Sequence, residues 1–336
     1  MRSFLILVPA LVASSLSGQP TVSEPMKYHG MCDASAAVAI DSTKFAVASD
    51  EDSKIRIYSA KGEKLPLQII DLTTFLELNP GHPETDMEGA ARIGERIYWI
   101  GSHGRNRDGR LRLDRQRFFA TTIKNSGSNV VLRLAGRPYK TLLQDLNKDP
   151  RFKLFNLAAA AQNAPKAPGG LNIEGLSATP ENHLLIGFRN PIPGGKALLI
   201  PMLNPDEVIE RKPARFGDAI RLDLDGLGIR DMAYLNGQYL IIAGHPDGRS
   251  HSHLYSWRGG STKAERIEVR HFKEYNPEAI IVYPEKGFEK IQILSDDGTR
   301  TMHGQPCKEL RDPAKRSFRS FWIELQGSRI ISVSPD

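Results

Sequence analysis

The segment Thr85-Asp86-Met87-Glu88-Gly89-Ala90 indicates a repeat, because its pattern of an acid before a small residue returns along the chain. Each copy begins a short apolar run, and after a turn a second apolar run ends in polar or charged residues. A fainter copy lies upstream at Asp33-Ala34-Ser35-Ala36. The later copies are Asn172-Ile173-Glu174-Gly175-Leu176, Arg230-Asp231-Met232-Ala233 and Asn276-Pro277-Glu278-Ala279-Ile280.

Repeats of strand-rich units indicate a β-propeller, since one four-stranded blade cannot bury both of its own faces and needs neighbours. The sequence predicts an all-β fold with five blades in a single domain over residues 24–334. Six blades remain the alternative, because five repeats of roughly 60 residues exceed the ~40–50 of compact propeller repeats. Insertions at Arg151 to Gly170 and Thr301 to Arg316 account for part of the excess.

Two parts of the chain depart from the strand pattern. Residues 151–162 contain the run Leu157-Ala158-Ala159-Ala160-Ala161 and are predicted to form a helix. The fifth repeat lacks an obvious fourth strand, so we expect an N-terminal strand at Glu24 to Tyr28 to pair beside Phe321 to Leu325 and close the ring. The competing candidate is Arg329 to Ser334.

The N-terminus and the cysteines indicate an exported protein. Residues 1–18 combine Arg2, an apolar run and a small-residue end, which predicts a cleaved signal peptide, with a short membrane anchor as the alternative. No later stretch is apolar and long enough to span a membrane. Cys32 and Cys307 stand in the first and last repeats, which are neighbours in a ring, so they form either a disulfide or two unpaired thiols. We expect a periplasmic or secreted monomer.

Composition and charge narrow the partners. The 336 residues are 40% hydrophobic and 25% charged, which is typical of a globular protein. The formal net charge of +6 produces only a weak positive field over a surface of this size. It is compatible with anionic partners such as small molecules. Nucleic acid is not expected, because no aromatic-interleaved basic groove pattern accompanies the charge.

The repeated acids are the first candidate site. The first strand of each blade lines the central channel, so Glu88, Glu174, Asp231 and Glu278 are predicted to converge there. Unpaired carboxylates in one space repel each other unless positive charges neutralise them. A bound Ca²⁺ is one answer, since it accepts six to eight oxygen ligands in irregular geometry. Pairing with side chains that end the second strands is another, and capping of backbone N–H groups, which only seals the channel, is the third.

The second strands and one loop supply candidates for catalysis and anion binding. His103 and His245 are proton-transfer candidates beside Glu88 and Glu174, because imidazole titrates near neutral pH. Arg189 is predicted to hold a carboxylate or phosphate, and the loop arginines Arg105, Arg107 and Arg110 to widen that anion site. The alternative for the loop is a solvated strand edge that charge protects from pairing.

The motifs resemble a family of secreted bacterial proteins known as domain of unknown function 3616. The resemblance is carried by Asp86-Met87-Glu88-Gly89 with Tyr98-Trp99-Ile100-Gly101-Ser102-His103, and by Asn172-Ile173-Glu174-Gly175-Leu176 with Gly187-Phe188-Arg189-Asn190-Pro191. It implies a β-propeller and no activity, because the family has none assigned. A more distant likeness to phytase-like and esterase-like propellers rests on the Glu-Gly pair alone.

Two functions follow from these patterns. The first is a metal-assisted hydrolase of an anionic ester or phosphoester, and the second is a non-catalytic ligand- or protein-binding propeller with a structural acidic channel. A hydrolase needs a water-accessible pocket that unites the acids, histidines and arginine, whereas a binding platform has a sealed channel and an exposed patch. Other hydrolase and nucleotide-binding motifs, such as Gly-x-Ser-x-Gly, the Walker loop and His-Glu-x-x-His, are absent from the sequence.

Overall fold

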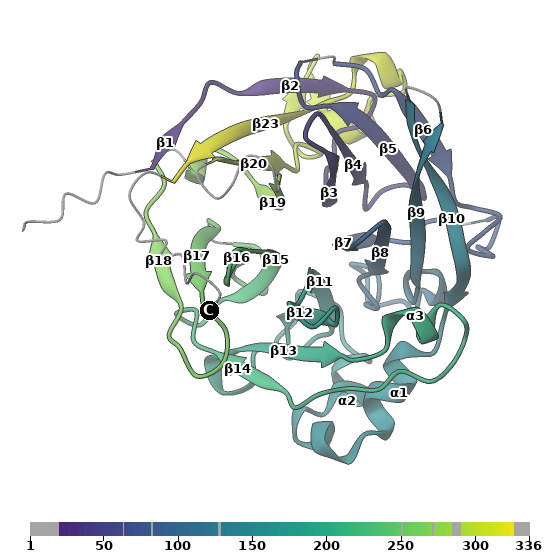
Figure 1. The fold of residues 1–336 in the computed structure, drawn as a ribbon, viewed down its shortest axis with the longest axis vertical. Coiled ribbons are helices and arrows are strands. Elements are labelled where there is room, and N and C mark those ends of the chain that lie inside the picture. Colours follow the sequence, from purple (N-terminus) through teal and green to yellow (C-terminus); the bar gives the residue numbers. More distant parts are fainter. Residues whose placement is uncertain are drawn as a thin grey trace, which may run out of the picture.

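The computed structural model describes residues 20–62, 64–81, 83–126, 129–249, 251–270, 272–283 and 290–325. Within these residues, five antiparallel sheets stand around one axis as the blades of a propeller, with the first strand of each nearest the centre (Figure 1). The predicted β-propeller with five blades is therefore confirmed.

Blades 1 to 4 are each built from four strands that are consecutive in the chain. Blade 1 contains β3 (Ala36–Asp41), β4 (Lys44–Ala48), β5 (Lys54–Ser59) and β6 (Gln68–Asp71). Blade 2 contains β7 (Met87–Ile93), β8 (Arg96–Gly101), β9 (Phe118–Ser126) and β10 (Asn129–Tyr139). Blade 3 contains β11 (Asn172–Ala178), β12 (Leu184–Asn190), β13 (Ala197–Met202) and β14 (Ile220–Leu222). Blade 4 contains β15 (Gly228–Leu235), β16 (Gln238–Gly244), β17 (His253–Trp257) and β18 (Glu265–Ile267).

Blade 5 joins the two ends of the chain. Its C-terminal strands are β19 (Pro277–Val282), β20 (Lys290–Ser295) and β23 (Ser317–Glu324), and the outer positions belong to β1 (Thr21–Val22) and β2 (Met26–His29). Both N-terminal strands pair antiparallel with β23. The predicted closure by an N-terminal strand is confirmed, but the register differs: Met26–His29 pair with Ser317–Ser320, and Thr21–Val22 pair with Ile323–Glu324. Arg329 to Ser334 lie outside the described residues.

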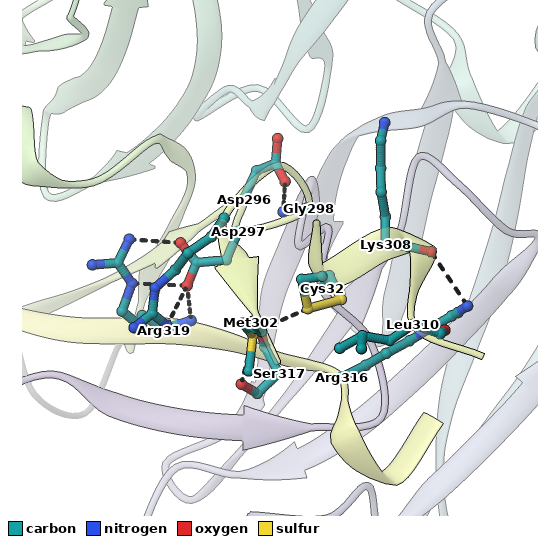
Figure 2. Close-up of a disulfide and its surroundings, with 12 residues drawn as sticks. Cys32, Asp296, Asp297, Gly298, Met302, Lys308, Leu310, Arg316, Ser317 and Arg319 are labelled. Carbon is teal, nitrogen blue, oxygen red and sulfur yellow. Dashed lines mark hydrogen bonds and ion pairs between the residues drawn. A yellow bond between two sulfur atoms is a disulfide. The ribbon is translucent and has the colours of Figure 1, made fainter. Parts of the chain in front are cut away.

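A disulfide adds a covalent link at the same junction. Cys32 and Cys307 are bonded, with their Cα atoms 5.9 Å apart, so the predicted bridge is confirmed. Both residues are buried. Cys307 begins the short helix η6 (Cys307–Glu309), which follows the hairpin of β21 (Thr301–Met302) and β22 (Gln305–Pro306). The bridge therefore ties the insertion of blade 5 to the start of blade 1 (Figure 2).

The predicted helix over residues 151–162 is present only as shorter pieces. They are α1 (Leu142–Lys148), the 3-10 helix η2 (Pro150–Phe155) and α2 (Leu157–Ala160). Asn156 separates the last two because its φ of 49° lies in the left-handed region, which no α-helix continues through. The other short helices are α3 (Pro205–Val208), η1 (Leu113–Arg115), η3 (Pro193–Gly195), η4 (Phe272–Glu274) and η7 (Pro313–Lys315).

The hydrophobic core lies between the blades. Each pair of neighbouring blades shares one cluster of buried apolar side chains, including the pair formed by blades 5 and 1. Between blades 1 and 2, Trp99 and Phe119 are stacked and fully buried. Burying one such large side chain contributes about 1.5–3 kcal/mol, which explains why a blade is stable only beside its neighbours. In the described part of the chain, no helix is long and apolar enough to cross a membrane.

Candidate functional site

A polar cavity of about 960 Å³ lies at the end of the channel where the inner strands begin and the second strands end. All five blades or the segments that connect them contribute to its lining. The lining includes Glu88, Glu174 and Glu278, so three of the four acids that were predicted to converge do meet in one space.

Backbone bulges place these acids. In β7, β11, β15 and β19 the pairing with the second strand skips one residue, and that residue is Glu88, Glu174, Arg230 or Glu278. A bulge re-aims the extra side chain, which is why bulges are common beside functional sites. Small residues after the bulges allow neighbouring inner strands to approach. A Cβ on Gly89 would lie 2.9 Å from Leu176 Cβ and 3.0 Å from the Glu174 carbonyl oxygen.

The bulge also explains why Asp231 does not join the other acids. In blade 4 the bulged position is occupied by Arg230, and Asp231 stands one residue later, where β15 is again paired with β16. Asp231 is absent from the cavity lining, and its carboxylate accepts a hydrogen bond from the backbone N–H of Ile280 at 2.6 Å. The predicted four-acid ring is therefore a ring of three glutamates and one arginine.

We call the first part of the cavity the arginine-paired half, formed by Glu174, Arg189, Arg230, Asn276 and Glu278. Arg189 Nη1 donates to Glu174 Oε1 at 2.6 Å, and Arg230 Nε lies 3.6 Å from Glu174 Oε2. Arg230 also forms an ion pair with Glu278 and donates to Asn276 Oδ1 at 2.8 Å. Burial, followed by the charge of Arg189, lowers the pKa of Arg230 to about 10, so its guanidinium remains charged at neutral pH. This half therefore follows the pairing alternative of the sequence analysis.

We call the second part the acidic half, formed by the lining residues Asp50, Asp86, Glu88 and Asp296 together with buried Asp33, which interacts with Asp296 and lies outside the lining. Asp50, Asp86 and Glu88 each offer one carboxylate oxygen, and these three oxygens all lie within 4.8 Å of one another. Asp50 Oδ1 is shielded from solvent and has no hydrogen-bond partner among the described residues. Three close carboxylates of this kind are a donor set for a hard divalent cation.

The neighbours of these three carboxylates neutralise them only in part. Arg115 Nη1 donates to Asp86 Oδ2 at 2.7 Å and Arg115 also pairs with Glu84, while Ser35 Oγ donates to Glu88 Oε2 at 2.6 Å. Burial raises the pKa of Asp86 to about 6 although Arg115 opposes the shift. Burial also raises the pKa of Glu88 well above its usual range, and the charges of Glu174 and Asp86 add to the effect. The pKa of Asp50 is raised in the same way by burial and by nearby Asp296 and Glu88.

The disulfide region lies next to the acidic half and positions two of its carboxylates, Asp33 and Asp296. Asp33 follows Cys32, and burial together with the charge of Asp296 raises the pKa of Asp33 to about 8. Asp296 accepts from the backbone N–H of Gly298 at 2.8 Å, as Figure 2 shows. A Cβ on Gly298 would lie 1.6 Å from Asp33 Oδ1, so glycine is required at this close approach.

Neither predicted histidine lies in the cavity lining. His103 is buried with its Nδ1 2.9 Å from the Gly101 carbonyl oxygen, and burial lowers its pKa to about 4. The side chain of His245 is 47% exposed and contacts Asp247 at 2.6 Å. The water-accessible pocket thus unites acids and arginines without either histidine, and a hydrolytic reaction here would depend on other groups for proton transfer.

The arginine-rich loop divides between structural and exposed roles. Arg105 donates to the Ala161 and Gly109 carbonyl oxygens at 2.8 and 3.1 Å and does not line the cavity. Arg110 is exposed and also lies outside the lining, whereas Arg107 is part of it with its side chain 92% exposed.

Other basic side chains stand at the cavity in place of Arg105 and Arg110. Arg112 and Lys166 line it, and neither forms an ion pair with another described residue. Lys308 lines it as well but pairs with Glu51 at 2.7 Å. Arg112 and Lys166 are therefore the basic side chains at the cavity that have no ion-pair partner among the described residues.

Several residues of the site were missed in the sequence analysis although a signal for them exists. Asp86, Asn172 and Asn276 each stand two residues before a bulged glutamate. Asp50 and Asp296 follow the second apolar runs of their repeats, as Arg189 follows the apolar run of β12. The repeat therefore marks two rings of polar residues, one before the bulge and one at the end of the second strand.

Comparisons with known proteins assign no activity. A comparison with curated proteins found no match. Among solved structures, the PQQ-bound form of an aldose sugar dehydrogenase from Streptomyces coelicolor is 12% identical, with a TM-score of 0.46, over 90% of this chain and 98% of that one. A streptogramin B lyase is 9% identical, with a TM-score of 0.39, over 89% of this chain and 97% of that one. Neither likeness bears on activity.

A family match covers most of the chain in two segments, residues 33–123 and 124–290. These segments contain the bulged residues Glu88, Glu174, Arg230 and Glu278, together with Asp50 and Asp86. The chain therefore belongs to the family described as protein of unknown function (DUF3616).

Proposed function

We propose that the acidic half of the cavity binds a divalent cation through Asp50, Asp86 and Glu88, with Ca²⁺ as the first candidate. The observation that carries the proposal is the approach of three carboxylate oxygens to within 4.8 Å of one another. The unpartnered Oδ1 of Asp50 supports it independently, because a shielded acceptor without a partner costs about 1–3 kcal/mol. The raised pKa values of the three carboxyl groups also fit, since a cation is the partner that allows all of them to ionise.

The donor set favours a hard cation. Asp50, Asp86 and Glu88 offer oxygen atoms only, and no histidine or cysteine belongs to the described lining. Ca²⁺ and Mg²⁺ take oxygen ligands, whereas zinc sites are built mainly from histidine and cysteine. Glu174 and Glu278 are engaged by arginines, so we do not assign them to the cation.

The reaction that fits this cavity best is hydrolysis of a small anionic ester or phosphoester. When bound, a divalent cation lowers the pKa of a coordinated water and polarises an ester or phosphoryl oxygen. Arg112 and Lys166 stand at the same cavity and would attract and orient the anionic group. The volume of about 960 Å³ is large enough to admit such a substrate together with water.

Calcium binding is the first test. Thermal melts and calorimetric titrations would compare wild type with the double variant Asp50→Asn, Glu88→Gln in chelator and in millimolar calcium. A cation that binds only the folded state raises stability, and at ten times Kd the gain is about 1.4 kcal/mol, or a few degrees in Tm. We expect this rise in wild type and in Glu181→Gln, an exposed acid in the turn between β11 and β12, and its loss in the double variant. Equal melting temperatures of wild type in chelator and in calcium would contradict the proposal that a cation binds here.

Turnover is the second test and separates the two functions. Phosphoester, carboxylester and lactone panels would be screened with calcium and with chelator. Calcium-dependent hydrolysis that falls at least 100-fold in Asp50→Asn supports the hydrolase. Calcium binding without turnover of any panel member would favour the non-catalytic alternative, a propeller that binds its ligand in the same cavity.

We also propose that the protein is exported to the periplasm or secreted. The Cys32–Cys307 disulfide supports this, because such bonds persist in oxidising compartments. The predicted signal peptide at residues 1–18 lies outside the described residues. Mass spectrometry of the mature protein should show a chain that begins near Ser17 or Gly18, and an intact N-terminus in a cytoplasmic fraction would contradict export.

A further inference from the structure

The cavity lining is unusually polar for a small-molecule site. Ala164 and Pro165 are its only apolar side chains among the described residues. Ligand pockets are more often lined mainly by hydrophobic and aromatic side chains. A ligand with a long acyl or aryl group would therefore find little apolar surface here, whereas a ligand rich in hydroxyl groups would find many hydrogen-bonding partners.

Asn172 carries the most specific signal for the nature of this ligand. It is only 5% exposed and lines the cavity at the start of β11. Its Nδ2 donates to Glu174 Oε1 at 2.7 Å, which sets the orientation of the amide, since the reverse orientation would place two acceptors together. Asn172 Oδ1 is then left shielded and without a partner among the described residues.

The equivalent residue of blade 5 shows that this free acceptor is not a general feature of the repeat. Asn276 also stands two residues before a bulged glutamate, but its Oδ1 accepts from Arg230 at 2.8 Å. Its Nδ2 donates to Asp296 Oδ2 at 3.0 Å. In blade 3 this acceptor thus has no partner, whereas its counterpart in blade 5 is satisfied internally, and a hydrogen-bond donor on a ligand in the cavity would supply the missing partner.

We propose that the ligand of this cavity is a hydroxyl-rich anion of sugar size, whose hydroxyl group donates to Asn172 Oδ1. This inference rests on the proposed function, because the anionic group of the ligand meets the cation on Asp50, Asp86 and Glu88 and the basic rim of Arg112 and Lys166. A sugar phosphate and a sugar acid share the required chemistry, an anionic group together with several hydroxyl groups. Asn172 is then a specificity-determining residue that separates hydroxylated anions from alkyl anions.

The test uses ligand pairs that differ in hydroxyl groups and share the anionic group. Glucose 6-phosphate would be compared with n-hexyl phosphate, and gluconate with hexanoate, by calorimetric titration of the calcium-loaded full chain. We expect at least one hydroxylated member to bind tenfold or more tightly than its alkyl partner, and the pair that responds identifies phosphate or carboxylate as the anion. Alkyl members that bind as tightly as the hydroxylated ones would overturn the inference, as would calcium-loaded protein that binds neither pair.

A variant then assigns the preference to Asn172. Asn172→Leu removes the acceptor at similar volume and should lower affinity for the hydroxylated member about tenfold, with no change for the alkyl member. Asn147→Leu, the same substitution at an exposed position of α1, should keep the wild-type ratio. An unchanged ratio in Asn172→Leu would overturn the assignment, and the wild-type ligand pairs still test the ligand class if this variant fails to fold. Calcium titration of the same samples distinguishes failure of the proposed cation site from failure of the ligand proposal. If the cation site is wrong, no calcium binding is seen, whereas if only the ligand proposal is wrong, calcium still binds.

Discussion

The two halves of the cavity differ in how the charges of their buried carboxylates are compensated. In the arginine-paired half, Glu174 and Glu278 are answered by Arg189 and Arg230. In the acidic half, Asp50 and Glu88 form no ion pair with another described residue, and only Asp86 meets an arginine, Arg115. The difference arises because the inner strand of blade 4 places an arginine at the bulge where the strands of blades 2, 3 and 5 place a glutamate.

This comparison separates structural charges from charges available for a ligand. A buried charge that has its partner inside the protein holds its neighbours in place, and removing one partner leaves the other uncompensated. A group of carboxylates without internal cations is kept neutral by protons or by a bound cation. The arginine-paired half should therefore matter most for stability, and the acidic half most for binding.

The largest expected effect is on the arginine-paired half. Arg230→Met removes the cation that contacts both Glu174 and Glu278, and we expect the free energy of unfolding to fall by about 3–5 kcal/mol. Denaturant unfolding measures this fall. Arg249→Met is the control, because the Arg249–Asp247 pair has an arginine side chain that is 87% exposed and should contribute about 1 kcal/mol or less. A fall of similar size in both variants would contradict the conclusion that the arginine-paired half matters most for stability.

The disulfide should have the next largest effect. The Cys32–Cys307 bond closes a loop with a sequence separation of 275 and anchors the Asp296 side of the acidic half. Replacing both cysteines with serine is expected to lower the free energy of unfolding by about 2–5 kcal/mol. Urea unfolding of the oxidised wild type, the reduced wild type and the double variant would measure it. Unchanged stability in both altered forms would show that the β1 and β2 strands close the ring without the covalent link.

The pH dependence of stability should reveal the acidic half in chelator. The pKa of Asp33 is about 8 in the folded protein and about 3.9 in an unfolded chain, so between these values the folded state holds a proton that the unfolded state has lost. The stabilising contribution is therefore full below pH 4 and is lost as pH rises through 8. We expect the fall in Tm from pH 5 to pH 8.5 to be smaller in Asp33→Asn than in wild type. Asp108→Asn, at an exposed carboxylate, should keep the wild-type slope, and a steeper fall in Asp33→Asn would contradict the assignment.

The smallest effect should come from Glu88 without calcium. Glu88→Gln removes a carboxylate that lies near Glu174 and Asp86, so in chelator at neutral pH the free energy of unfolding should stay constant or rise by up to about 1 kcal/mol. Glu278→Gln is the matched control at the equivalent bulge and should be destabilising, because it weakens the pair with Arg230. Chemical unfolding of both variants measures the difference. If Glu88→Gln destabilised as much as Glu278→Gln, the acidic half would be structural too.

Much of the fold could be predicted from the sequence because a propeller repeats its signals. The recurrence of acid and small residue located the inner strands, and the missing strand of the fifth repeat indicated closure by the N-terminal segment. The helical segment was placed correctly, but it is divided, since the left-handed Asn156 separates η2 from α2, and a further helix, α1, precedes it. Local propensity predicted the helix, and the packing against blades 2 and 3 set its ends.

Repetition and ring closure made the propeller, its repeats and the convergence of Glu88, Glu174 and Glu278 on one space predictable. The choice between a disulfide and two unpaired thiols at Cys32 and Cys307, and between five and six blades, came from the structure. Which of these acids form ion pairs depends on contacts between blades, which the sequence pattern does not show. In blade 4 the bulged position is occupied by Arg230 and the acid stands one residue later, so Arg230 enters the ring and Asp231 accepts from the Ile280 backbone. Asp50 follows β4 of blade 1, whereas Asp86 and Glu88 stand at the start of β7 in blade 2. These side chains meet only when the two blades pack, and no local pattern encodes that contact.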